Sequence, residues 1–188
     1  MNNGRFLVVV SGPSGSGKDT VVKRLMELHP EIEISVSATT RPMRAGEQEG
    51  VNYYYLSQQE FERRLAAGEI LEHTRYCGNY YGTPKSEVDR RIAQGVTVVL
   101  VIEVEGAANI RRLYPQATTV FICPPSMQAL EARLRGRGTE SEEAIQKRLR
   151  RAAEEMSFAG QYTETLVNDT VDGCAQRLYD IILQRQKG

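Results

Sequence analysis

The sequence predicts an α/β fold in which helices cover a parallel central sheet. Three apolar, β-branched runs, residues 7–10, 96–104 and 118–123, have the composition of buried strands. Helical patterns separate these runs, and strands that alternate with helices form parallel sheets through helical crossovers. Residues 37–82 and the arginine-rich residues 133–151 break the alternation, so we expect them to lie off the sheet as insertions.

The helices are predicted by their caps and periodicity. Ser57 and Glu60 form a capping box, and Gly68 and Gly95 follow the last residues of two helical patterns. A shorter β-like run covers residues 32–36. The predicted helices cover residues 20–29, 57–67, 85–94, 126–134, 141–157 and 172–186.

Composition limits the class of protein. At 188 residues the chain fits one compact unit that buries about 70% of its unfolded surface. Lys and Arg number 24, as do Asp and Glu, which gives no reason to expect binding to nucleic acid or to an anionic membrane. Cys77, Cys123 and Cys174 are odd in number and far apart, as in proteins with reduced thiols. We therefore predict a cytoplasmic monomer or small homo-oligomer.

A glycine-rich loop lies between the first strand and the first helix. Glycines there can take positive φ, so that backbone N–H groups turn inward beside the positive end of the helix, and a lysine adds a full charge. This order of strand, loop and helix is that of a P-loop and predicts binding of a nucleoside triphosphate. The loop residues are Gly12, Pro13, Ser14, Gly15, Ser16, Gly17, Lys18, Asp19 and Thr20.

The last position of the P-loop pattern holds Asp19 where Ser or Thr is usual. A carboxylate so close to phosphates requires a cation, which predicts Mg²⁺ bound together with the triphosphate. Either Asp19 or the next residue, Thr20, would contact the metal, and the sequence leaves both open.

Two arginines form a second candidate site. Arg41 and Arg44 flank Pro42, which prevents a simple continuation of strand or helix. Two guanidinium groups on a bent loop suit a phosphate monoester, whose oxygens they can grip in pairs. Tyr53 and Tyr81 would add hydroxyl donors, while about half of the tyrosines at 53–55, 80 and 81 are expected only to pack a small β-layer.

Over essentially its whole length the chain resembles guanylate kinases. The resemblance implies a P-loop NTPase three-layer fold with a parallel central sheet, a GMP-binding insertion and a helical lid. It implies transfer of the γ-phosphate of ATP to GMP, and also to dGMP, giving ADP and the nucleoside diphosphate. The motifs that carry it are Ser11-Gly12-Pro13-Ser14-Gly15 with Gly17-Lys18, Ser37 with Thr39-Thr40-Arg41, Arg44-Ala45-Gly46-Glu47, Gly78-Asn79-Tyr80-Tyr81-Gly82 and Arg137-Gly138-Thr139-Glu140.

The resemblance also divides the chain and assigns its residues. It implies a core of residues 1–36, 84–130 and 159–188, a GMP-binding insertion of residues 37–83 and a lid of residues 131–158. The GMP phosphate would be bound by Arg41, Arg44, Tyr53 and Tyr81, and the base by Glu72 and Ser37 with Thr83 nearby.

The chemistry of Glu72 supports this assignment. Guanine presents N1–H and a 2-amino group side by side, and one carboxylate can accept from both, whereas the Ser37 hydroxyl can donate to O6. Adenine has an acceptor at N1 and lacks the 2-amino group. An unpaired buried polar group costs about 1–3 kcal/mol, so Glu72 is expected to be the main selectivity residue.

Phosphoryl transfer requires alignment and neutralisation of charge rather than a general base. Lys18 would span the β and γ phosphates, and by resemblance the lid arginines Arg133, Arg137 and Arg148 would close over the transferred group.

The second acidic strand of the family corresponds to residues 98–103, where Val101 replaces the first acid. Glu103 alone would then contact GMP or the magnesium shell, and Asp19 would compensate for the missing charge.

Two other functions are compatible with parts of this pattern. One is a related P-loop kinase that acts on a sugar phosphate such as ribose 1,5-bisphosphate, against which Ser37, Glu72 and Tyr81 together argue. The other is a noncatalytic guanylate-kinase-like domain that binds a phosphorylated partner, against which Lys18 and the arginine-rich segment argue.

Overall fold

The computed structural model describes residues 5–136 and 141–187, and its main sheet is parallel throughout. Within these residues the sheet has five strands in the order β2-β7-β1-β8-β9. The strands are β1 (Leu7–Ser11), β2 (Ile32–Ile34), β7 (Thr97–Val101), β8 (Thr118–Cys123) and β9 (Glu164–Val167). The predicted α/β class with a parallel central sheet is confirmed.

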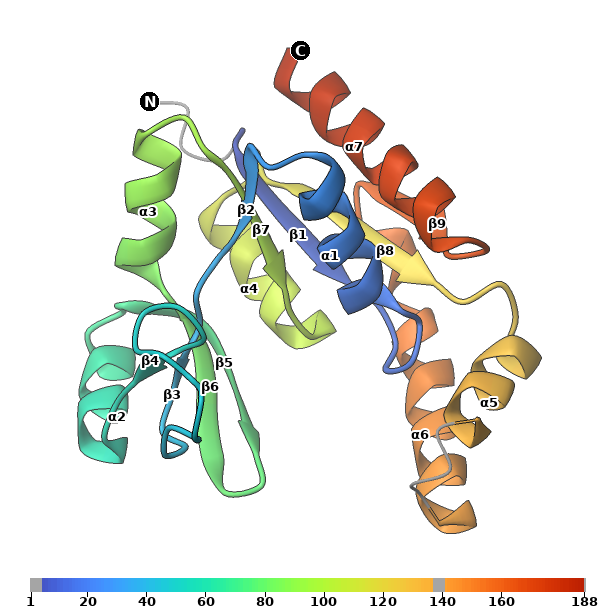
Figure 1. The fold of residues 1–188 in the computed structure, drawn as a ribbon, viewed down its shortest axis with the longest axis horizontal. Coiled ribbons are helices and arrows are strands. Elements are labelled where there is room, and N and C mark those ends of the chain that lie inside the picture. The colour runs from blue at the N-terminus through green and yellow to red at the C-terminus, as the bar shows by residue number, and fades with distance from the viewer. Residues whose placement is uncertain (1–4, 137–140, 188) are drawn as a thin grey trace.

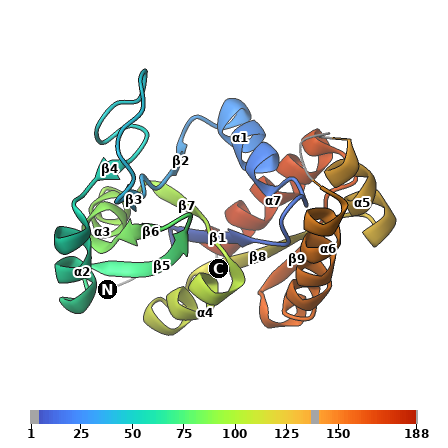
Figure 2. The ribbon, with the colours of Figure 1, turned by 90° about the horizontal axis from the view of Figure 1, so that it is seen from below.

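Helices cover both faces of this sheet because its strands are apolar on both sides. Val8 and Val10 of β1 pack with α1 (Lys18–Leu28) and α7 (Val171–Lys187). Leu7 and Val9, which point to the opposite face, pack with α3 (Lys85–Ala93) and α4 (Val104–Leu113). Figure 2 shows α1 and α4 on opposite sides of the strands. The result is a three-layer core.

A small second sheet follows β2 in the chain. In the described residues its order is β4-β3-β6-β5, and α2 (Gln58–Ala66) packs on it through Phe61. The β5–β6 hairpin turns at Cys77 and Gly78, whose positive φ values of 48° and 80° suit a tight hairpin turn. The strands are β3 (Ala38–Thr39), β4 (Tyr54–Tyr55), β5 (Ile70–Tyr76) and β6 (Asn79–Pro84).

The other insertion is a pair of helices with its own apolar cluster. α5 (Met127–Arg135) and α6 (Glu142–Met156) pack through Leu130, Leu134, Ile145 and Ala152. Figures 1 and 2 place this pair and the small sheet at opposite ends of the molecule. A short 3-10 helix, η1 (Ala159–Gln161), leads from α6 to β9. No helix in the described ranges is long and apolar enough to cross a membrane.

Several boundaries differ from the sequence prediction. The predicted strand 96–104 ends at Val101, and Val104 already belongs to α4, with Glu103 in an extended conformation at the N-cap position and no side-chain cap hydrogen bond. The β-like run 32–36 forms a three-residue strand, and the first helix begins at Lys18 rather than Thr20. The predicted helix starts at Ser57, Ser126 and Ser141 are confirmed as caps, since each hydroxyl accepts a backbone N–H of the first turn.

Candidate functional site

The glycine-rich loop links the carboxyl end of β1 to the first turn of α1. Gly12, Gly15 and Gly17 take φ of 150°, 92° and 87°, which side chains disfavour. A Cβ on Gly17 would lie 2.4 Å from Asn168 Nδ2, and one on Gly12 would lie 2.2 Å from the Ile122 carbonyl oxygen. These positions of the loop therefore require glycine. Inward-facing backbone N–H groups at a helix N-terminus form an anion-binding nest.

Two side chains from later in the sequence hold this loop in place. Arg133 Nη1 and Asn168 Nδ2 both donate to the Ser16 carbonyl oxygen, at 3.1 and 2.8 Å. Arg133 Nη2 also donates to the Asn168 carbonyl oxygen at 2.9 Å. From α6, Arg148 Nη2 donates to Ser14 Oγ at 2.6 Å. Two predicted lid arginines thus contact the phosphate loop, whereas Arg137 lies outside the described residues.

A cavity of about 320 Å³ joins the loop to the small sheet. It lies at the carboxyl end of β1 and β7, where ligands bind in open parallel sheets. The described residues that were predicted for the site but are not part of its lining are Gly12, Pro13, Gly15, Ser16, Gly17, Thr20, Arg41, Arg44, Tyr53, Thr83, Arg133 and Arg148. Its lining residues are Ser14, Lys18, Asp19, Ser37, Glu72, Thr74, Tyr81, Gly82, Val101, Ile102 and Glu103.

Glu72 is the most deeply buried acid of this cavity, with 8% of its surface exposed. Its Oε1 accepts from Thr83 Oγ1 at 2.6 Å, and Thr83 itself is buried and is not part of the lining. Burial raises the pKa of Glu72 above the ordinary carboxyl value, the Thr83 hydrogen bonds oppose the rise, and the negative charge of Glu103 adds to it. The site thus presents a desolvated carboxylate whose natural complement is a pair of N–H donors.

The predicted phosphate residues form a separate cluster on the small sheet. Arg41 pairs with Glu47 through two hydrogen bonds, of 3.0 and 2.7 Å, and its Cζ lies 5.5 Å from the centre of the Tyr53 ring. The Tyr53 and Tyr81 rings meet edge to face at 5.9 Å, which connects the cluster to the cavity. Arg44 is exposed, and its backbone N–H donates to Glu47 at 2.8 Å.

Glu47, which the sequence analysis named only in the motif Arg44-Ala45-Gly46-Glu47, lies at the centre of this cluster. It also accepts from the Tyr55 hydroxyl at 2.8 Å, so it organises most of the cluster. Hydrogen bonds from Arg41 and from the Arg44 backbone lower the pKa of Glu47 to about 2. Of the other tyrosines, Tyr54 donates to Glu87, and Tyr80 stacks on Phe61, in agreement with a packing role.

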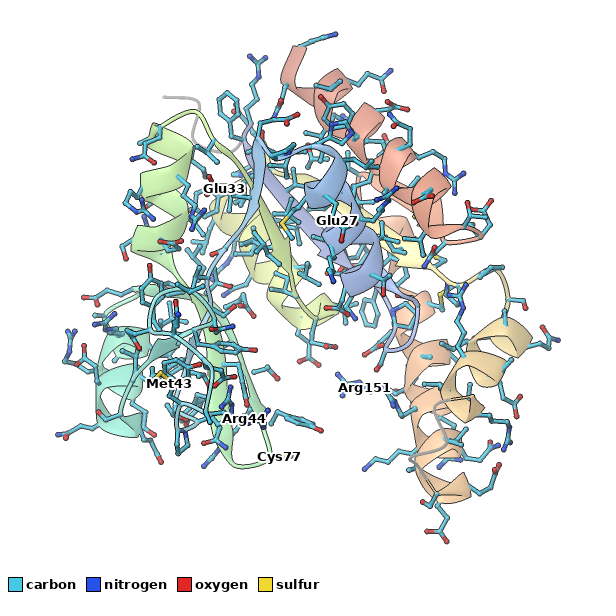
Figure 3. All side chains as sticks on the ribbon, viewed as in Figure 1. Glu27, Glu33, Met43, Arg44, Cys77 and Arg151 are labelled. Carbon is cyan, nitrogen blue, oxygen red and sulfur yellow. The ribbon has the colours of Figure 1, made fainter. Side chains whose placement is uncertain are left out.

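Glu103 lies where β7 ends and α4 begins, with its carboxylate in the cavity wall. Its Oε2 accepts from Arg151 Nη2 at 3.2 Å, and Arg151 Nε donates to Glu155 at 2.8 Å. Figure 3 shows Arg151 extending from α6 towards the middle of the molecule, while Arg44 lies on the side of the small sheet, in the loop between β3 and β4. Arg151, which was not predicted as a site residue, therefore links α6 to the cavity.

The chain is similar to known proteins over nearly its whole length. The sequence pattern described as guanylate kinase matches residues 4–185. The chain is 49% identical over 177 residues to a guanylate kinase of Synechococcus sp. (strain CC9902), with 94% of each chain covered. It is 47% identical to a guanylate kinase of Prochlorococcus marinus (strain MIT 9312), with 97% of this chain and 99% of the other covered.

A solved structure is similar as well. The crystal structure of guanylate kinase from Anaplasma phagocytophilum superimposes with a TM-score of 0.74 at 34% identity, covering 100% of this chain and 89% of that one. The phosphate loop, the buried carboxylate and the arginine cluster thus occur in a chain that matches the family pattern over nearly all its length. The chain belongs to the guanylate kinase family.

Proposed function

We propose that this protein transfers the γ-phosphate of ATP to GMP, and also to dGMP, giving ADP and GDP or dGDP. The observation that carries the proposal is the single cavity that contains both Lys18 of the phosphate loop and the buried carboxylate of Glu72. One group suits a polyphosphate and the other a guanine edge, so the phosphate end of the donor and the base of the acceptor would meet at this cavity.

Guanine recognition is assigned to Glu72 and Ser37. The Glu72 carboxylate accepts from N1–H and the 2-amino group, while Thr83 bonds one of its oxygens and holds its orientation. The Ser37 hydroxyl, in the same cavity wall, donates to O6. An adenine in this place would leave the carboxylate without its donors, which is why AMP is rejected.

The GMP phosphate is assigned to Arg41, Arg44, Tyr53 and Tyr81. The double hydrogen bond to Glu47 fixes the plane of the Arg41 guanidinium, and the Tyr53 ring packs beside it. A fixed guanidinium loses little conformational entropy when it binds phosphate oxygens. Residues 37–83 act in this proposal as the GMP-binding insertion.

Transfer itself is assigned to Lys18 and to the arginines of residues 131–158, which act as the lid. Lys18 neutralises the β and γ phosphates, and Arg133, Arg137 and Arg148 stabilise charge on the transferred group. Arg133 and Arg148 already contact the backbone or side chains of the loop, so closure brings them to phosphates bound there. The GMP phosphate is itself the nucleophile and needs no general base.

A magnesium ion bound with ATP fits the donor set at Asp19. Asp19 is exposed and lines the cavity beside Lys18, whereas Thr20 is not in the lining. Mg²⁺ keeps several waters and takes one or two carboxylates plus phosphate oxygens, so Asp19 with the phosphates suffices. When bound, the ion neutralises phosphate charge. Val101 stands where the family usually has an acid, and Asp19 lines the same cavity. Asp19 would therefore supply the negative charge that Val101 lacks.

A coupled assay of ADP release with separate acceptors tests the proposal. We expect turnover with GMP and dGMP and little with AMP, UMP or CMP. Turnover with ribose 1,5-bisphosphate instead of GMP would favour the sugar-phosphate kinase. Binding of a phosphopeptide without any ADP release would favour the noncatalytic domain.

A further inference from the structure

We propose that Gly106 determines guanine selectivity by leaving the space in which the Glu72 carboxylate lies. Gly106 is the third residue of α4, and α4 packs directly against β5, the strand that carries Glu72. The inference rests on the proposed function, because it concerns how Glu72 is held for GMP. It makes Gly106 a positioning residue that acts through Glu72.

The contacts at Gly106 involve one side chain. A Cβ built on Gly106 would lie 2.8 Å from Glu72 Oε2, 3.2 Å from its Cγ and 3.3 Å from its Cβ. These are the three nearest atoms, and all belong to Glu72. A methyl group at position 106 would therefore clash with one carboxylate oxygen of Glu72 and press on the rest of that side chain.

The backbone gives no other reason for a glycine here. Gly106 lies within α4, and its φ is outside the left-handed region, so an alanine would fit the helix. Glycine is the poorer helix former of the two, since it loses more backbone entropy on folding. What requires the glycine is thus the neighbouring carboxylate.

Neither the helix nor the strand can move aside easily. Asn109, three residues after Gly106 in α4, donates through Nδ2 to the Leu71 carbonyl oxygen at 2.8 Å, next to Glu72 in β5. Ala107 and Ile110 of α4 are fully buried in the core. The Glu72 side chain is the softer partner, so an added methyl group would turn the carboxylate away and break its geometry with Thr83.

Turning the carboxylate has a specific chemical result. Reading N1–H and the 2-amino group together requires both oxygens in the plane of the base. Inosine monophosphate (IMP) has N1–H and lacks the 2-amino group, so it needs only one of the two contacts. A rotated Glu72 should therefore weaken the binding of GMP more than that of IMP, and so reduce the preference for GMP over IMP.

The experiment is steady-state kinetics of Gly106→Ala with GMP, IMP and ATP as varied substrates. We expect the KM for GMP to rise about tenfold, the GMP:IMP ratio of kcat/KM to fall by a similar factor, and the KM for ATP to stay within about twofold. Gly160→Ala is the matched control, because no atom lies within 4 Å of a Cβ there and its φ is not left-handed.

A double-variant cycle separates positioning from simple structural damage. In a Glu72→Gln background, where the carboxylate is already gone, adding Gly106→Ala should change the GMP:IMP ratio little, so the two effects are not additive. Fully additive effects would overturn the inference. So would a failure of Gly106→Ala to fold, or a fall in Tm of more than about 5 °C with equal losses for GMP and IMP.

The outcomes also distinguish the inference from the proposed function. If Glu72→Gln leaves the GMP:IMP ratio unchanged, the assignment of Glu72 as the guanine reader is wrong. If Glu72→Gln abolishes the preference and Gly106→Ala leaves it intact, only the role of Gly106 is overturned.

Discussion

Glu47 holds both terminal nitrogens of the Arg41 guanidinium, with Nη1 donating to Oε2 and Nη2 to Oε1. The same carboxylate accepts from Tyr55 and from the Arg44 backbone, so one acid fixes the loop that carries both arginines. Contacts within the protein therefore fix the plane of the Arg41 guanidinium, which we propose binds the GMP phosphate, and changing Glu47 tests whether this matters.

Glu47→Gln should raise the KM for GMP about tenfold with a smaller change in kcat, because the Arg41 plane loses a charge-assisted bidentate partner. Since Arg41 and the Arg44 backbone keep the pKa of Glu47 at about 2, the carboxylate is ionised at any assay pH. The effect should therefore not vary between about pH 5 and 9. Steady-state kinetics measure it, with Glu69→Gln, an exposed acid of the same region, as the control. An unchanged KM would show that the phosphate cluster does not need Glu47.

The titration of Glu72 should make kcat/KM for GMP depend on pH, in a range above that of an ordinary carboxyl group. Burial raises its pKa, and only the ionised form accepts both guanine hydrogens, so kcat/KM for GMP should fall as pH drops through that raised pKa. The GMP phosphate also titrates near pH 6, about the value of phosphate monoesters. The profile of Glu72→Gln, which keeps only the phosphate inflection, is the reference. Identical profiles for both proteins would contradict the assignment.

Lys18→Ala should lower kcat by about 10²- to 10³-fold, the range found when a transition-state donor is removed. Lys18 opens α1 and is largely buried beside the cavity, whereas Lys23 on the same helix is exposed. Lys23→Ala is the matched control and should keep full activity. The measurement is single-turnover transfer to GMP at saturating ATP. A fall in the transfer rate of less than about tenfold would contradict a role for Lys18 in the transfer step.

Asp19→Ser should raise the Mg²⁺ concentration needed for half-maximal activity several-fold, because Asp19 lines the cavity and supplies the carboxylate. Thr20→Ala should leave that concentration unchanged, since Thr20 lies outside the cavity wall. Titration of Mg²⁺ at fixed ATP measures both. If Thr20→Ala changes the requirement and Asp19→Ser does not, the hydroxyl is the metal contact.

The sequence predicted those parts of the fold whose cause is local. The β-branched runs at residues 7–10 and 118–123 form central strands, and the serine caps begin their helices where expected. The glycine-rich loop was predictable for the same reason, since positive φ at three glycines is a property of the residues themselves. Local hydrogen bonding and backbone freedom decide these features, and both can be read from a few adjacent residues.

Long-range contacts decided the rest. Residues 98–102 and 104 are apolar with only Glu103 between them, a pattern that predicts one continuous strand, and packing in the core sets where β7 ends and α4 begins. β9 is a strand because β8 offers it a parallel edge. The contact between Gly106 of α4 and Glu72 of β5 likewise depends on how separate elements meet. Side-chain burial and close approach are properties of the folded chain, so a linear pattern carries no direct record of them.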